Sequence, residues 1–176
     1  MVSLIAKTPL DGLLPAEAGP LTLREVTYDP IQSIAVFKGK SEPVRKAMKQ
    51  ATGAELPLPN RTISPVLWFA PDQYLVLGHW VQNLDGIAAV TDQSDAWAIL
   101  SVEGAEVENI LSRLIPIDLR YAVFSEGQTA RTMIGHMTAS VTRMAADRFE
   151  LMVMRSMAGT LVHEVCKAAK VYDSRR

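Results

Sequence analysis

The residues best placed to do chemistry are the two acids of the segment DQSDAW, Asp92 and Asp95. Paired carboxylates can act as general acid and general base when their environments separate their pKa values. Three residues apart between two apolar stretches, aspartates more often bond the backbone N–H groups of a turn. Ser94 lies between them outside any G-x-S-x-G frame, so nothing supports its use as a nucleophile. We interpret the segment as a turn, with an active site as the alternative.

Other chemistry-bearing residue types are scattered. His79, His136 and His163 stand far apart and form no H-x-x-x-H pair, which argues against a zinc site. The single cysteine, Cys166, excludes an internal disulfide and a multi-cysteine metal cage. Neither a Walker A loop nor G-x-G-x-x-G occurs. We therefore assign no catalytic, cofactor-binding or metal-binding residue.

Arginines are the remaining candidates for a ligand. Arg61, Arg131 and Arg155 could each hold a carboxylate or phosphate through two parallel hydrogen bonds. Each could equally anchor an interface or pair with an aspartate. The residues expected to have a structural or interface role are Asn60, Arg61, Asp92, Ser94, Trp97 and Arg155.

The elements that must position these residues follow from apolar periodicity. Segment 97–102 alternates, with Ala98, Leu100 and Val102 on one face and Trp97 as a buried anchor on the other. Ser41 is the expected N-cap of a helix that Gly53 ends. Strands are predicted over 31–38, 66–69, 74–77, 97–102, 128–134, 138–144 and 148–154, and helices over 41–53, over 105–115 and after an N-cap at Ser156.

The order of elements predicts an α+β fold, with mostly antiparallel sheets and helices on one face. Residues 1–30 contain four prolines and are expected to form an irregular arm, which either folds over its own core or docks on a partner. Residues 31–176 form one domain in this interpretation. A small-residue, aspartate and aromatic pattern at 70–74 and again at 145–149 divides it into two pseudo-repeated halves, about 31–87 and 88–176.

Bulk properties exclude several classes of protein. The 176 residues are 48% hydrophobic and 21% charged, as in ordinary globular proteins. The formal net charge of -1 gives no field that would attract nucleic acid or an anionic membrane surface. No stretch approaches the roughly 20 apolar residues of a membrane span, and the N-terminus lacks the pattern of a secretory signal. We expect a cytoplasmic protein with no nucleic-acid or membrane partner.

Several segments, taken in order, resemble a known family. They are LPLPNR, LWFAPDQYLVLG, VTDQSDAWAILSVEGAEVENILSRLIPIDL, FSEGQTARTMIGHM and FELMVMRSMAGTLVHEV, which extend from about residue 56 to residue 165. Together they resemble the gamma subunit of heterotetrameric sarcosine oxidase, and more distantly the folate-binding domain of aminomethyltransferases of the glycine-cleavage T-protein type. The resemblance implies a duplicated ferredoxin-like, folate-binding-domain-like fold.

The resemblance also implies a function. In that family, the complex oxidatively demethylates sarcosine to glycine and passes the one-carbon unit to tetrahydrofolate. FAD, FMN, NAD and tetrahydrofolate belong to the alpha and beta subunits, so this chain is expected to be an accessory, non-catalytic subunit with alpha, beta and delta partners. The alternative is an independent folate-binding or aminomethyltransferase-like protein. On the accessory interpretation, DQSDAW is the joint between the two halves, and Gly104 precedes the helix of the second half.

Overall fold

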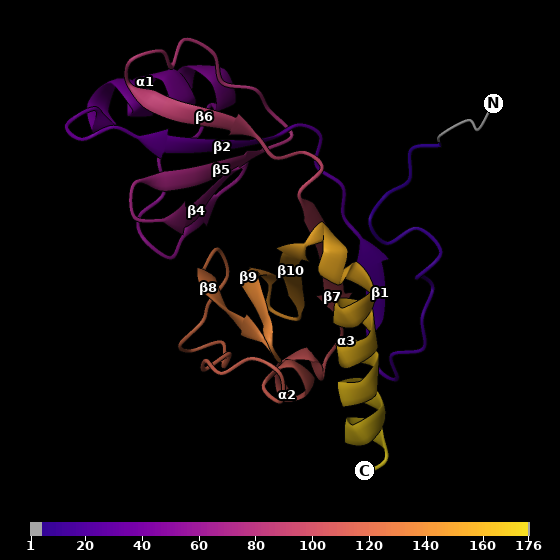
Figure 1. Ribbon diagram of the computed structural model, residues 1–176. Helices are drawn as coiled ribbons and strands as arrows, with labels where there is room; N and C mark the ends of the chain where they lie inside the picture. Colours follow the sequence, from indigo (N-terminus) through magenta and orange to yellow (C-terminus); the bar gives the residue numbers. More distant parts are fainter. Residues whose placement is uncertain (1–4, 176) are drawn as a thin grey trace.

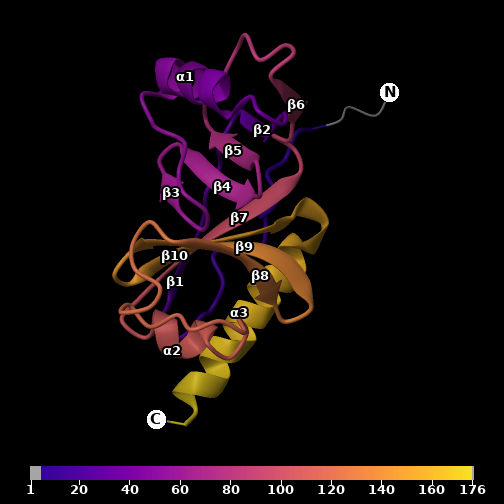
Figure 2. The same cartoon turned by 90° about the vertical axis from the view of Figure 1, so that its left-hand side faces the viewer.

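The computed structural model describes residues 5–175 as two five-stranded antiparallel sheets that face each other. Each sheet carries helices on its outer face only, so the layers run helix, sheet, sheet, helices (Figure 1 and, seen from the side, Figure 2). This arrangement confirms the predicted α+β class with antiparallel sheets.

The first sheet has the strand order β3-β4-β5-β2-β6. Its strands are β2 (Ile31–Val36), β3 (Thr62–Ile63), β4 (Val66–Ala70), β5 (Gln73–Leu77) and β6 (Ala88–Asp92), and helix α1 (Ser41–Thr52) covers it. Val44 and Met48 of α1 are fully buried against Ile34 and Val76 of the sheet. Gly53 ends α1 in the left-handed conformation at φ 75°, as predicted. The predicted N-cap at Ser41 is wrong by one residue, because Ser41 is already helical and Lys40 precedes it without a side-chain cap.

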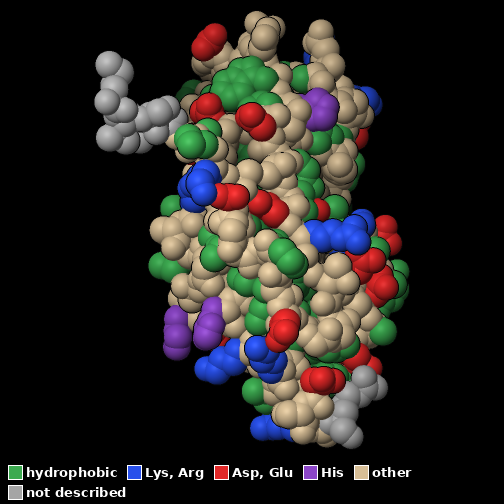
Figure 3. All heavy atoms as spheres, turned by 90° about the vertical axis from the view of Figure 1, so that its right-hand side faces the viewer, with side chains coloured by type: hydrophobic (Ala, Val, Ile, Leu, Met, Phe, Trp, Pro, Cys, Tyr) green, Lys and Arg blue, Asp and Glu red, His purple; other side chains and the backbone are tan. Residues whose placement is uncertain are grey.

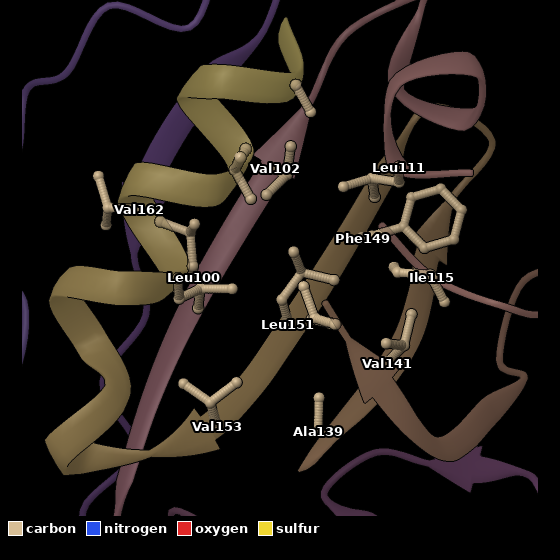
Figure 4. Packing of buried hydrophobic residues seen from close by; sticks show 14 of the residues in the cluster. Leu100, Val102, Leu111, Ile115, Ala139, Val141, Phe149, Leu151, Val153 and Val162 are labelled. Atoms are coloured by element: carbon tan, nitrogen blue, oxygen red, sulfur yellow. The ribbon is translucent and has the colours of Figure 1, made fainter. Parts of the chain in front are cut away.

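The second sheet has the order β1-β7-β10-β9-β8. Its strands are β1 (Thr22–Glu25), β7 (Trp97–Glu103), β8 (Thr129–Ile134), β9 (Met137–Ala145) and β10 (Arg148–Met154), and helices α2 (Val107–Leu111) and α3 (Ala158–Asp173) cover it. Figure 4 shows the core between these layers, where Leu100, Val102 and Leu151 of the sheet are fully buried beside Val162 of α3.

The two helices of the second half begin or end at other residues than the sequence predicted. Helix α2 is shorter than 105–115 because the backbone tightens to turns after Leu111, where the N–H of Leu114 donates to the Leu111 carbonyl at 2.9 Å. Ser156 is not an N-cap, because it lies within the 3₁₀ turn Arg155–Met157 and Met157 precedes α3.

The two halves share a ferredoxin-like strand order but take the last strand from different places. Along the chain, each half contains a strand, then a helix, then a pair of strands. In the sheet these three strands lie in the order β4-β5-β2 in the first half and β9-β10-β7 in the second. The strand beside β2 is β6, which follows in sequence, whereas the strand beside β7 is β1, from the N-terminal segment. Whether the halves are a true repeat stays a prediction.

This arrangement corrects two boundaries. Residues 1–30 are not irregular throughout, because the backbone of β1 pairs with β7, with Thr22 opposite Glu103 and Glu25 opposite Leu100. Residues 88–92 belong to the first sheet, so the sheets meet at 93–96 rather than after 87. Residues 1–4 of the predicted arm lie outside the described part of the chain.

Gly104 is needed where the N-terminal segment crosses the end of β7. A Cβ at this position would lie 2.6 Å from the backbone oxygen of Pro20, closer than real Cβ contacts. Leu10 and Leu21 of the same segment are buried in the core of the second half. The described part of the segment therefore folds over the chain's own core.

Candidate functional site

Asp92 is the last residue of β6, and Asp95 lies in the connection between the two sheets, at 93–96. The Asp92 Oδ1 atom accepts hydrogen bonds from the Ser94 hydroxyl at 2.6 Å and the Ser94 backbone N–H at 3.0 Å. The bond from the Ser94 hydroxyl, and to a smaller extent the bond from its backbone N–H, hold the pKa of the exposed Asp92 carboxyl below its ordinary value. The Ser94 hydroxyl oxygen in turn accepts the backbone N–H of Ile31 at 3.0 Å. This geometry is that of a turn with an ionised carboxylate, and it leaves no activated nucleophile.

Trp97 anchors that connection between the sheets. Its side chain is 8% exposed, which confirms the predicted burial. The indole N–H donates to the Gln93 side-chain oxygen at 3.0 Å. The ring meets Phe69 of β4 edge-on, with centroids 5.4 Å apart, so one aromatic pair spans both sheets.

Arg155 fixes the N-terminal segment to the same connection. Its backbone N–H donates to the Ala96 carbonyl at 2.8 Å, and its guanidinium lies 3.4 Å from Asp95 and donates to the Lys7 carbonyl. The guanidinium is thus engaged by the chain's own groups. A hollow of about 450 Å³ separates this segment from the connection.

Asn60 and Arg61 lie at the opposite edge of the sheets, far from Asp92. The Asn60 carbonyl accepts the N–H of Thr129 at 3.0 Å, and Arg61 forms an isolated antiparallel bridge with Gln128. Asn60 adopts the left-handed conformation at φ 59°. These contacts join the edge strands β3 and β8. The structure therefore brings Asp92, Ser94, Trp97 and Arg155 together at one joint and leaves Asn60 and Arg61 at the other.

Between the two joints lies a cavity of about 320 Å³, lined by both sheets. Leu67 and Leu77 come from the first sheet, and Ile99 and Met152 from the second. The polar lining includes Ser140, Thr142, Tyr28 and Glu150. It is a largely apolar hollow with a few polar groups, as small-molecule sites usually are.

Glu150 is the acidic residue of this lining, which also includes His79. The Tyr28 hydroxyl lies 3.2 Å from its Oε1 and 3.1 Å from its Oε2. Burial raises the pKa of the Glu150 carboxyl above its ordinary value, although the bond from Tyr28 acts in the opposite direction. Burial, and then the charge of Glu150, raise the pKa of the Tyr28 hydroxyl, so Tyr28 remains a neutral donor.

Buried hydroxyls continue the polar lining along β8 and β9. Thr129 and Thr142 lie 2.8 Å apart through their hydroxyl oxygens, and Ser140 lies 3.4 Å from Thr129. All three residues are buried. The hydroxyls can satisfy one another, which keeps this face of the sheet polar without leaving them unpaired.

Within residues 5–175, no group of three or more His, Cys, Asp or Glu side chains is placed to hold a metal ion. Acidic, basic and neutral side chains are interspersed on the face in Figure 3, where histidine side chains appear at the lower left and, well apart from these, at the upper right. Burial raises the pKa of the Cys166 thiol, which disfavours a reactive thiolate. Among the described residues, no helix is long and apolar enough to cross a membrane.

Sequence reasoning missed Tyr28 and Glu150 as partners because they are 122 positions apart. The available signal was Glu150 itself, an acid inside the alternating strand FELMVM. There Phe149, Leu151 and Val153 are fully buried on one face, and Glu150 and Met152 alternate onto the other. A charge at such a position indicates a face that is not purely core.

The geometry defines the class of protein: two facing ferredoxin-like α+β units with a small cavity between them. No family model matches the sequence, and no curated protein matches it by sequence. Similar folds occur among solved structures. A chain of the heterotetrameric sarcosine oxidase of Corynebacterium sp. U-96, solved with pyrrole 2-carboxylate, is 22% identical with a TM-score of 0.81, over 95% of this chain and 96% of that chain.

A second solved structure shares the fold more loosely. The glycine cleavage system aminomethyltransferase T of Bartonella henselae is 11% identical with a TM-score of 0.55, over 85% of this chain. This chain spans 46% of that longer protein. The likeness to both structures confirms the fold that the sequence resemblance implied.

Proposed function

We propose that this chain is the accessory gamma subunit of a heterotetrameric sarcosine oxidase complex and is not catalytic by itself. The observation that carries the proposal is the likeness to a chain of such an enzyme over nearly the full length of both chains.

The arrangement of the predicted residues supports an accessory role. Asp92, Ser94, Trp97 and Arg155 are bonded within the joint between the sheets. In this proposal the complex demethylates sarcosine to glycine with one-carbon transfer to tetrahydrofolate. The flavins, NAD and tetrahydrofolate are held by the alpha and beta subunits, and the alpha, beta and delta subunits are the partners.

Co-purification tests this function. The tagged chain is co-expressed with the alpha, beta and delta subunits of a sarcosine oxidase from the same source, and an unrelated tagged protein of similar size serves as the control. We expect all three subunits to elute with the tagged chain and sarcosine oxidation to be present in that fraction. Recovery of a folded chain without any of the three would overturn the proposal.

An independent folate-binding or aminomethyltransferase-like protein is the second candidate. It is favoured by the looser likeness to an aminomethyltransferase and by the cavity between the sheets. Calorimetry of the isolated chain with tetrahydrofolate decides this candidate. Saturable heat would support it, and no heat at near-millimolar ligand would remove it.

A further inference from the structure

The cavity between the sheets contains a carboxylate without a cationic partner. Within residues 5–175, Glu150 forms no ion pair, and neither lysine nor arginine lines the cavity. The one histidine of the lining, His79, is exposed, and its Nδ1 atom lies 3.3 Å from the Leu77 carbonyl oxygen rather than at Glu150. Arg148 on the same strand lowers the pKa of Glu150 only through its field, and its own side chain is exposed. Burial of a carboxylate costs free energy unless a positive group or several hydrogen bonds compensate.

The hydrogen bonds present do not fill the capacity of Glu150. An ionised carboxylate has about four acceptor positions on its two oxygens. The Tyr28 hydroxyl carries a single proton and lies almost equally far from both oxygens, at 3.1 and 3.2 Å. The remaining acceptor positions belong to a side chain that lines the cavity.

The rest of the lining limits what could approach. Leu67, Ile99 and Met152 supply apolar walls, and Ser140 and Thr142 supply hydroxyls. A volume of about 320 Å³ lies at the small end of ligand pockets. A compact apolar body with one positive, N–H-bearing group matches both the shape and the charge.

We propose that this cavity is a binding site for a small organic cation of the ammonium or amidinium class, with Glu150 as its counter-ion and Tyr28 as the residue that orients the carboxylate. The N–H groups of the ligand donate to Glu150, and its apolar body fills the space between Leu67 and Met152. The site is a property of this chain and does not depend on its assembly with other subunits.

Titration of the purified chain with benzylammonium chloride tests the site, with benzyl alcohol as the uncharged probe of the same shape. We expect saturable binding of benzylammonium, at least about tenfold tighter than that of benzyl alcohol, as a charge-assisted hydrogen bond would give. Glu150→Gln, which keeps the shape and removes the charge, is expected to abolish this preference. The matched control Glu126→Gln, exposed and outside the lining, is expected to leave it unchanged.

A second variant keeps the test decisive if Glu150→Gln fails to fold. Leu77→Phe narrows the cavity from the first sheet and should weaken the binding of both probes. Equal affinity for the charged and uncharged probes would overturn the proposal, as would benzylammonium binding that survives both variants. Absence of any saturable binding to the folded chain would also overturn it.

Discussion

The two faces of the second sheet differ although the same strands build them. On the face toward α2 and α3, Leu100, Val102 and Leu151 are fully buried among apolar neighbours. On the face toward the first sheet, Ser101 and Ser140 are buried, and Glu150 and its Tyr28 partner line a cavity. Because side chains alternate along a strand, consecutive residues serve these two environments.

This difference assigns stability to the helix-covered face and binding to the face that lines the cavity. Apolar groups packed against helices stabilise the fold in proportion to the area they remove from water. Polar groups on a buried face contribute little unless they are bonded, so their presence indicates a role other than packing. Variants on the helix-covered face should therefore lower the free energy of unfolding more than variants on the cavity face.

The largest effect is expected at Phe149 on the helix-covered face. Its ring is fully buried and stacks on Phe124 with centroids 6.3 Å apart. Phe149→Ala should lower the free energy of unfolding by about 3–5 kcal/mol, because it leaves a cavity in the core. Urea titration measures the change, with the exposed Val123→Ala as control. A loss of unfolding free energy no larger than that of Val123→Ala would contradict the greater importance of the helix-covered face for stability.

The order of elements and the helix-covered core were predictable from the sequence because they depend on local periodicity. The strand 148–154 has the predicted bounds, and α1 ends at the predicted glycine. Strand β1 was missed because it is four residues long and becomes a strand only by pairing with β7, about eighty positions away along the chain. The cavity was missed for the same reason, since Tyr28 and Glu150 meet only in the folded chain.

The next effect is expected where the N-terminal segment crosses β7. Gly104→Ala would place a Cβ against the Pro20 carbonyl, so the segment must move. We expect a loss of about 1–3 kcal/mol, in the range of overpacked sites, and faster amide hydrogen exchange in β1. Gly159→Ala, where a Cβ would meet open space, is the matched control. Unchanged exchange in β1 would show that the segment does not depend on this close approach.

A smaller effect is expected at the joint between the sheets. Ser94→Ala removes the hydroxyl oxygen that accepts the Ile31 N–H. It also removes the hydroxyl proton that is donated to the Asp92 carboxylate. The loss should be about 0.5–1.5 kcal/mol, that of a typical hydrogen bond. Ser94→Thr retains the hydroxyl and should recover most of it. Chemical denaturation of the two variants side by side checks the result, and equal losses would assign no role to the hydroxyl.

The smallest change in stability, with a distinct pH dependence, is expected at Glu150. Its pKa is raised in the folded chain, so folding binds a proton more tightly there than the unfolded chain does. The resulting stabilisation is present below the ordinary pKa of 4.5 and is lost as the pH rises through the folded value. Glu150→Gln should remove this loss and be no less stable than the wild type at neutral pH. Melting temperatures measured from pH 4 upward, at about half-unit steps, compare the two. A variant clearly less stable at neutral pH would place Glu150 among the stabilising residues.

Light scattering of the assembled mixture tests the accessory role most directly. The wild-type chain, of 19.3 kDa, is mixed with purified alpha, beta and delta subunits, and the mass of each eluted species is measured. We predict a single species that contains one copy of each subunit, and we predict that Glu150→Gln joins it equally well. A folded wild-type chain that elutes at its own mass beside the other three subunits would contradict the proposed function.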